Sequence, residues 1–412
     1  MNPLPILAAL LAGLGLGAYG QGSDWGLVIG AIATPVGGLW LNGLKMTIVP
    51  LVVSLLITGI AKTAQARQAG RLAGASILCF LIILWSSSLL AAMVTPWLAD
   101  LVPLDGQSAK ALRDTLVGAK PMGEIPGIAD FVLSIIPSNP IAAAANDAIL
   151  PLIVFSGTFA FAMLRLPISQ RQPLTGLFES ISETMLTVIG WVLSLAPAGV
   201  FALAFVVASR SGLAVLGLLA HYVAIVSLVG TIVWLAAWPV AWAGGRVNPV
   251  RFTRALLPSQ AVAISTQSSL ASLPAMLKAV QSLGVPAVKA DIILPLAVAL
   301  FRATGPAMNL AVALYIAHVL GIHPGPGQLL AGIAAAATTT LGAVSLPGQL
   351  SFVSSIAPIS MAMGVPFEPL ALLIAVETLP DIMRTMGNVA MDVAATTVIN
   401  RVTSGETAAI ER

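Results

Sequence analysis

Apolar runs long enough to cross a lipid bilayer recur along nearly the whole chain, and no other feature limits the fold as strongly. A helix of about 20 apolar residues covers the hydrocarbon core of a bilayer. The runs lie near 4–36 (interrupted by glycines around Gly20–Gly26), 44–64, 72–98, 150–166, 175–208, 212–244, 249–283, 288–320, 327–363 and 367–400. A backbone in lipid must satisfy its own hydrogen bonds, and the alternating pattern of a membrane barrel is absent, so these runs predict helices.

The composition supports a membrane protein and narrows the classes of partner. Of 412 residues, 58% are hydrophobic and 8% are charged, whereas soluble domains are about one quarter charged. The net charge of +3 comes without a basic patch, so no nucleic-acid partner is expected. The single cysteine, Cys79, excludes an internal disulfide and a cysteine-ligated zinc site. The N-terminus has no basic segment and therefore predicts a first spanning helix rather than a cleaved signal. We expect an all-α polytopic membrane protein.

Charged residues between the runs predict how the chain is oriented. Three loops are basic, and they contain Lys62, Arg67 and Arg71, then Arg165 and Arg171, then Arg246, Arg251 and Arg254. Segment 99–130 instead mixes acidic with basic residues. Because cytoplasmic loops are enriched in Lys and Arg, we expect the basic loops and the tail 402–412 in the cytoplasm of a bacterium. Segment 99–130 would then lie on the outer side of the inner membrane.

Two of the apolar blocks are interrupted by small polar residues, proline and glycine. Block 249–283 contains Ser265–Ser269 and Pro274, and block 327–363 contains Thr338–Thr340 and Pro347-Gly348. Non-helical backbone is tolerated at membrane depth only where protein or a cavity surrounds it, so each block predicts a re-entrant hairpin. Paired interruptions of this kind point to a transporter substrate site. The alternative is two ordinary helices whose hydroxyls bond back to their own backbone.

The last block carries a stripe of polar residues. If 367–400 is one helix, steps of 100° per residue place six residues on one narrow face. They are Glu377, Asp381, Arg384, Thr385, Asn388 and Asp392. Each charge at the membrane centre costs roughly 2.5 to 3.5 kcal/mol, so the stripe must face a partner, a ligand or water.

The residue types of this stripe suit an amino acid with a second carboxylate. Arg384 can hold a carboxylate through two parallel hydrogen bonds, and Asp381 can accept hydrogen bonds from an ammonium group. Asn388 can donate to a second carboxylate, and Asp392 is a hard oxygen ligand for a small cation or a proton. The alternative is an internal ion pair between Asp381 and Arg384 that serves packing alone.

The run Asp381–Asp392 resembles the last helix of the glutamate-transporter family, the dicarboxylate/amino acid:cation symporters. That family has the pattern D-x-x-R-T-x-x-N-x-x-x-D there, and every position is present. Other stretches resemble the family in the same order, namely Leu44–Pro50, Ile136–Pro140 with Leu150-Pro151, Ala196–Phe201, Gln267–Pro274, and Gly342 with Pro347-Gly348. The resemblance therefore covers nearly the whole chain.

This resemblance implies eight transmembrane helices and two re-entrant hairpins per protomer, assembled as a homotrimer. A scaffold and trimerisation domain would comprise 1–71 and 128–208. A transport domain, 72–103 with 212–401, would move as an elevator and include the hairpins 249–283 and 327–363. The second hairpin would act as a gate.

The resemblance also implies roles for individual residues. Asp381 would bind the substrate amino group and Arg384 its side-chain carboxylate, while Asn388 and Ser269 would hold the main-chain carboxylate with help from Thr385. Ser268, Thr304, Ser345 and Gly348 complete the expected substrate site. Family members for dicarboxylates lack the amino-binding acid, so Asp381 favours aspartate or glutamate. A C4-dicarboxylate such as succinate or fumarate is the alternative.

The chain departs from the family where sodium is bound. The family's N-M-D-G-T sequence aligns with Phe301–Gly305, which has lost the asparagine and aspartate. We hypothesise that Arg302 is a fixed charge that replaces a bound cation and pairs with Asp392 or Asp381, so that coupling is to protons or is absent. The alternative is a structural or headgroup-facing Arg302. Asp392 with Asn388 remains the candidate cation site, with sodium as its possible metal and no other cofactor.

Other classes of function find little support in the sequence. The three histidines, His221, His318 and His323, have no metal-ligand spacing, and no nucleophile elbow or phosphate loop is present. A membrane-embedded enzyme is therefore a remote alternative. A channel is another, which concentrative uptake would distinguish from a carrier.

Overall fold

The computed structural model describes residues 4–68, 70–102, 136–146, 148–212, 214–342 and 348–403. Within these ranges the chain is helical and contains no strand, which confirms the predicted all-helical class. The helices of the first half are α1 (Leu4–Tyr19), α2 (Asp24–Gln68), α3 (Arg71–Leu101), α6 (Pro140–Ala145), α7 (Ile149–Met163), α8 (Ile168–Ser194) and α9 (Ala196–Ser211). Those of the second half are α10 (Ala214–Pro239) with a π-helical turn (Val240–Gly244), α11 (Pro249–Thr266), α12 (Ser269–Ser282), α13 (Ala287–Leu300), α14 (Thr304–Leu320), α15 (Pro326–Gly342), α16 (Gly348–Ala362), α17 (Leu370–Leu373) and α18 (Thr378–Val402).

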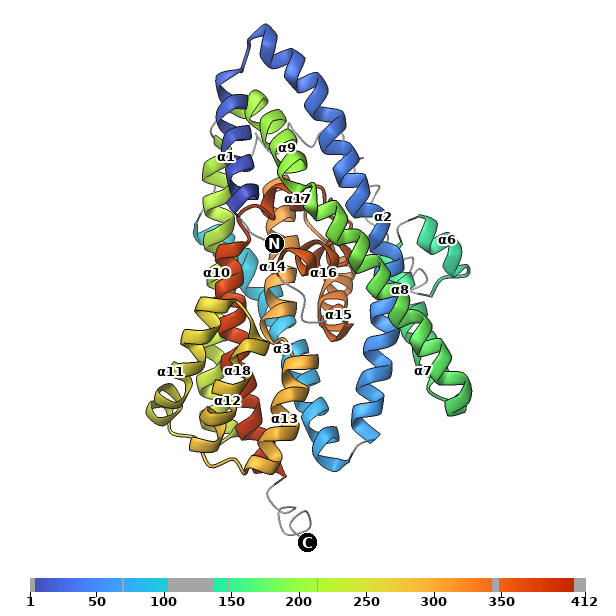
Figure 1. Ribbon diagram of the computed structural model, residues 1–412, viewed down its shortest axis with the longest axis vertical. Helices are drawn as coiled ribbons and strands as arrows, with labels where there is room; N and C mark the ends of the chain where they lie inside the picture. Colours follow the sequence, from blue (N-terminus) through green and yellow to red (C-terminus); the bar gives the residue numbers. More distant parts are fainter. Residues whose placement is uncertain are drawn as a thin grey trace.

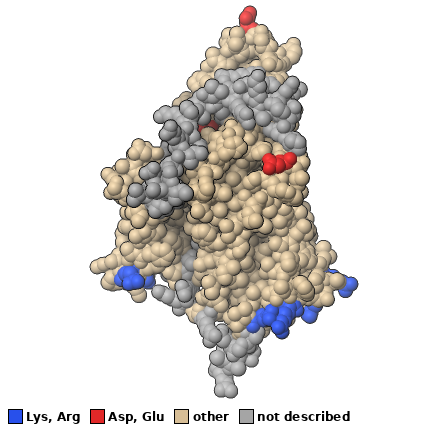
Figure 2. Space-filling model, turned by 180° about the vertical axis from the view of Figure 1, so that it is seen from behind, with Lys and Arg blue, Asp and Glu red and all other residues tan. Residues whose placement is uncertain are grey.

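Several of these helices have the length and apolar character of membrane spans. In the described part of the chain, four segments qualify, namely Asp24–Lys62, Leu72–Leu101, Ile168–Ser194 and Val215–Gly244. Figure 2 shows Lys and Arg near the lower end of the molecule, with Asp and Glu toward the opposite end. On this face, a broad band between them shows no Lys, Arg, Asp or Glu among the described residues, as expected for a surface in contact with lipid. The chain is a multi-pass membrane protein.

Two helix boundaries differ from the sequence prediction. The first run, 4–36, is divided at its glycine interruption as expected, but its second part continues without a break into the next run as α2. Gly22 has a positive φ of 73° and allows the sharp turn between α1 and α2. The expected single run 175–208 is also divided at Leu195, where Pro197 stands in the first turn of α9.

The helices form two groups of neighbours (Figure 1). In the first group α1 packs along α9, and α2 packs against α7, α8 and α9. Gly13 and Gly17 allow the close approach of α1 to α9, since a Cβ atom there would lie 2.6 Å from the Phe201 carbonyl oxygen and 2.5 Å from that of Phe205. In the second group α18 lies among α3 and α10 to α14.

Each interrupted block forms two helices that pack against each other, α11 with α12 and α15 with α16 (Figure 1). Between α11 and α12, Gln267 adopts the left-handed conformation with a φ of 50°, and Ser268 caps α12 by accepting a hydrogen bond from the Ala271 amide at 3.2 Å. In the second pair α15 ends at Gly342 and α16 begins at Gly348. Ser345, an expected site residue, lies outside the described residues.

The two blocks that follow the interrupted ones, 288–320 and 367–400, are not single helices, which corrects the prediction. Block 288–320 is interrupted at Phe301–Ala303 between α13 and α14. Block 367–400 contains the short α17, a turn and then α18, so that Glu377 stands just before the first residue of α18. Pro380 lies in the first turn of α18, where its missing N–H would have no helical partner in any case. The stripe therefore begins at a helix start rather than in mid-helix.

Candidate functional site

The polar stripe of α18 faces the interior of the second helix group. All six of its members are buried, with exposed fractions of 7% or less. They are Glu377, Asp381, Arg384, Thr385, Asn388 and Asp392. The arrangement follows from helix geometry, because positions three or four residues apart project from one face. A buried charge requires paired or hydrogen-bonding neighbours, and most of these side chains have them.

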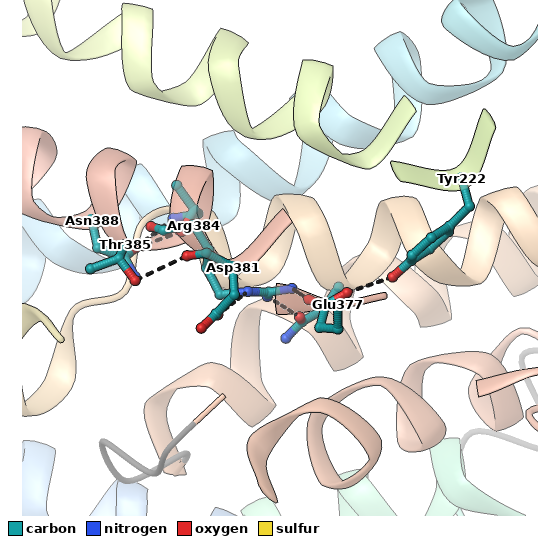
Figure 3. A network of polar contacts seen from close by, with 8 residues as sticks. Tyr222, Glu377, Asp381, Arg384, Thr385 and Asn388 are labelled. Atoms are coloured by element: carbon teal, nitrogen blue, oxygen red, sulfur yellow. Dashed lines mark hydrogen bonds and ion pairs between the residues drawn. The ribbon is translucent and has the colours of Figure 1, made fainter. Parts of the chain in front are cut away.

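Arg384 is the centre of the network in Figure 3. Its Nη2 lies 2.5 Å from Glu377 Oε1, its Nε lies 3.3 Å from Asp381 Oδ1, and its Nη1 donates to Asn309 Oδ1 at 2.5 Å. A guanidinium carries five N–H donors, so these contacts leave one N–H on each terminal nitrogen. The expected alternative of an internal Asp381–Arg384 ion pair is therefore present, yet the guanidinium keeps donors that a ligand can use.

Glu377 is bonded through both of its oxygens. Besides the contact with Arg384, Oε2 accepts a hydrogen bond of 2.6 Å from the Tyr222 hydroxyl, which projects from α10 (Figure 3). Tyr222 is fully buried and packs edge-on against Tyr315 of α14, with ring centroids 5.5 Å apart. Sequence reasoning assigned no role to Tyr222 or to Asn309. The sequence signal that could have identified them is that each is a polar side chain inside an apolar run.

A second set of contacts joins α18 to the start of α14. The Thr304 amide donates to Asn388 Oδ1 at 3.0 Å, and the Thr304 hydroxyl lies 2.7 Å from the same oxygen and 2.9 Å from the Arg384 carbonyl. These contacts use the carbonyl of the Asn388 amide, and no described residue bonds to its NH2 group. Thr385 instead donates to the Asp381 carbonyl of its own helix at 3.0 Å. Asn388 thus has a fixed orientation with donors still available.

The pair α11–α12 is held against α18 close to this network. Gln260 of α11 donates to the Met386 carbonyl at 3.2 Å and accepts from the Trp234 indole at 3.2 Å. The hydrogen bonds of Ser268 stay within its own hairpin, and within the described chain none joins Ser268 or Ser269 to α18. Gly348 begins α16, at the edge of the undescribed segment. The structure therefore brings Asp381, Arg384, Thr385, Asn388 and Thr304 together, but it does not bond the first hairpin to them.

Asp392 is a buried carboxylate without a hydrogen-bond partner in the described chain. Its exposure is 0%, and neither of its oxygens is bonded. It stands eight residues after Arg384, or about 12 Å along the helix axis. Arg302 forms no ion pair within 4 Å with Asp392 or with Asp381, so the direct pairing that we hypothesised is absent in this conformation. Burying an unpaired carboxylate is costly, which makes Asp392 a candidate for binding a cation or a proton.

The interruption between α13 and α14 offers few side-chain ligands for a metal. Phe301 is 1% exposed and stacks on Phe80 of α3 with ring centroids 4.6 Å apart. The Ala303 carbonyl accepts a hydrogen bond from the Ser87 hydroxyl at 2.6 Å. No cluster of three or more His, Cys, Asp or Glu residues suited to a metal occurs in the described ranges.

Comparison with known proteins places the chain among transporters. Residues 3–402 match the Sodium:dicarboxylate symporter family. The chain is 30% identical over 419 residues to the proton/glutamate-aspartate symporter of Escherichia coli K12, covering 96% of this chain and 91% of that protein. It is 26% identical to the proton/sodium-glutamate symport protein of Bacillus subtilis 168, covering 96% and 91%. It is 28% identical to the C4-dicarboxylate transport protein of Anaeromyxobacter sp. strain K, covering 90% and 84%.

Proposed function

The chain belongs to the sodium:dicarboxylate symporter family, and on that premise we propose that it carries an acidic amino acid, aspartate or glutamate, in symport with a cation. The family and the relatives are transporters and not enzymes, so the chain is a transporter. One observation carries the choice of substrate. Asp381 and Arg384, an acceptor for an ammonium group and a donor for a carboxylate, are both buried one turn apart on α18.

In the proposed binding mode each group of the substrate meets a complementary group. The ammonium is bound by Asp381, whose Oδ1 also lies 3.3 Å from Arg384 Nε. The side-chain carboxylate takes the remaining N–H donors of Arg384. The main-chain carboxylate is bound by the NH2 group of Asn388 and by Ser268 and Ser269 at the start of α12. Supporting contacts come from Thr385 and Thr304, and from Ser345 and Gly348 of the second hairpin.

The proposed coupling ion is a proton rather than sodium. The positions that align with the family's N-M-D sequence carry a phenyl ring, a guanidinium and a methyl group at Phe301, Arg302 and Ala303. The stacked pair of Phe301 and Phe80 puts aromatic carbon where a side-chain oxygen ligand would be needed. Arg302 supplies a fixed positive charge to the interior. Asp392 with Asn388 is the alternative cation site, with sodium as its metal.

We also propose an elevator mechanism in a homotrimer of the bacterial inner membrane. The group of α1, α2 and α7 to α9 would form the trimeric scaffold, and α3 with α10 to α18 would form the moving transport domain. The two helical hairpins would be re-entrant, and α15–α16 would be the gate. Support comes from the division of helix contacts, in which α18 packs within the second group.

A C4-dicarboxylate is the second candidate substrate. The relative from Anaeromyxobacter is named a C4-dicarboxylate transport protein. In addition, the ion pair of Asp381 with Arg384 satisfies part of the charge of Asp381 without any ammonium group. A dicarboxylate could then use Arg384 and Asn388 alone.

Thermal unfolding of the purified protein in detergent tests the proposal. Aspartate, glutamate and succinate are added separately, each with sodium and with choline in its place. A ligand at one hundred times its Kd stabilises the folded state by about 2.7 kcal/mol, which is a measurable rise in Tm. We expect the largest rise with aspartate or glutamate in either salt. A rise with succinate alone would favour the second candidate, and no rise with any of the three would contradict both.

A further inference from the structure

We propose that Glu377 binds the proton that enters with the substrate. This inference rests on the proposed function, since it assigns the coupled proton of that transporter to one side chain. It differs from a proton site at Asp392, which lies farther along α18 and has no contact with Arg384.

The contacts of Glu377 link it directly to the substrate site. Its side chain is 2% exposed, and its Oε1 lies 2.5 Å from Nη2 of Arg384, the residue proposed to hold the substrate side chain. Its other oxygen is bonded to Tyr222. A change in charge at Arg384 therefore acts on Glu377 at hydrogen-bonding distance. The same change acts on Asp392 only across about two turns of helix.

The balance of charges around Arg384 favours a proton on Glu377 once the substrate is bound. Before the substrate arrives, one guanidinium is in contact with two carboxylates, those of Glu377 and Asp381. The substrate side chain brings a third carboxylate to the same guanidinium, while the substrate ammonium pairs with Asp381. Glu377 and the substrate carboxylate then compete for Arg384. Because these side chains are buried, this excess negative charge is relieved when Glu377 accepts a proton.

The surroundings of Glu377 can accommodate both of its protonation states. Arg384 and Asp381 face it from α18, and Tyr222 faces it from α10, with Tyr315 of α14 behind Tyr222. In the described chain no cation other than Arg384 lies within 4 Å of it. A carboxyl group that gains a proton becomes a donor, and a tyrosine hydroxyl can either donate or accept. The contact with Tyr222 can thus persist with the direction of donation reversed.

The test uses the full chain reconstituted in liposomes with a pH-sensitive dye inside. Uptake of labelled aspartate, glutamate and succinate is measured from acid to alkaline pH, together with proton entry. If one proton binds with the substrate, the apparent affinity of the wild-type protein falls about tenfold for each pH unit on the alkaline side. Glu377→Gln, which resembles the protonated carboxyl group, is expected to lose this slope and the proton entry.

Two matched variants separate the explanations. Asp392→Asn removes the rival carboxyl group and is expected to keep the slope, and so is Glu183→Gln, which changes an exposed glutamate of α8. A wild-type slope and wild-type proton entry in Glu377→Gln would overturn the inference and leave the proposed substrate intact. Loss of the slope in Asp392→Asn but not in Glu377→Gln would also overturn the inference and leave the proposed substrate intact. If the wild-type protein takes up none of the three substrates, the proposed function falls and this inference falls with it.

Tyr222→Phe provides a second variant in case Glu377→Gln does not fold. Removing the hydroxyl takes away a donor that stabilises the ionised carboxylate, so Glu377 holds its proton at higher pH. The midpoint of the pH dependence should therefore move in the alkaline direction while proton entry persists. A midpoint equal to that of the wild-type protein would contradict the assignment.

Discussion

Glu377 contacts Arg384 across the first two turns of α18, so the buried arginine is already paired with an anion of the protein itself. Glu377 has helical backbone angles, with φ of -63° and ψ of -22°, and it stands seven residues before Arg384, so the two side chains project from the same face. Asp381 approaches the same guanidinium at Nε. An acidic substrate thus enters a site in which the charge of Arg384 is shared, and the following predictions test this arrangement.

Replacement of Arg384 by lysine should weaken the binding of the acidic substrate strongly. Lysine keeps the charge but loses the planar fork that contacts Glu377, Asp381 and Asn309. Hydrogen bonds to charged groups contribute about 1.5 to 3 kcal/mol each, so loss of one or two should raise the Kd at least about tenfold. Titration calorimetry with aspartate and glutamate measures this. Arg251→Lys, at an exposed arginine of α11, is the control and should bind normally.

Replacement of Asp381 by asparagine should change the preference between substrates. The ammonium of aspartate loses its acceptor, whereas succinate has no ammonium and gains from the removal of a nearby negative charge. We expect the ratio of aspartate to succinate affinity to fall by about tenfold or more. Competition between the two in an uptake assay gives this ratio directly. Asp291→Asn, at an exposed position of α13, should leave the ratio as it is in the wild-type protein.

Uptake should not depend on sodium. The interruption before α14 presents Phe301 and Ala303 where side-chain oxygens would be required, and neither carboxylate oxygen of Asp392 accepts a hydrogen bond from the described chain. Uptake into liposomes with choline in place of sodium should therefore match uptake with sodium to within about twofold, since a resident hard cation needs six or so oxygens. Strong sodium dependence that disappears in Asp392→Ala would show that Asp392 is a sodium ligand after all.

Replacement of Gly17 by alanine should destabilise the contact between α1 and α9. A Cβ atom at this position would lie 2.5 Å from the Phe205 carbonyl oxygen, which is backbone and cannot move aside cheaply. Overpacking of this kind costs about 1 to 3 kcal/mol, so the Tm should fall. Gly15→Ala lies on the same helix with no atom within 4 Å of the new methyl group, and it should leave the Tm equal or slightly higher. Equal Tm values for the two variants would contradict this packing.

Much of the helical content followed from the apolar runs, but the helix boundaries did not. The merger of α2 across two runs and the division at Leu195 depend on where glycine and proline allow a turn, and hydropathy does not record this. Glu377 illustrates the same limit. Its place on the helical wheel put it on the stripe, whereas its position before the first turn of α18 came from the local backbone.

The sequence by itself determined that α18 carries a buried row of acids, an arginine and an asparagine, because their spacing follows the helical repeat whatever surrounds the helix. It also determined the all-helical membrane class, because lipid leaves a spanning segment few other ways to satisfy its backbone. Only the tertiary structure decided which groups meet Glu377 and Arg384. Tyr222 and Asn309 come from helices distant in sequence, and their contacts depend on packing between helices, which no local pattern specifies. For the same reason the lack of an ion pair between Arg302 and Asp392 became visible only in the folded chain.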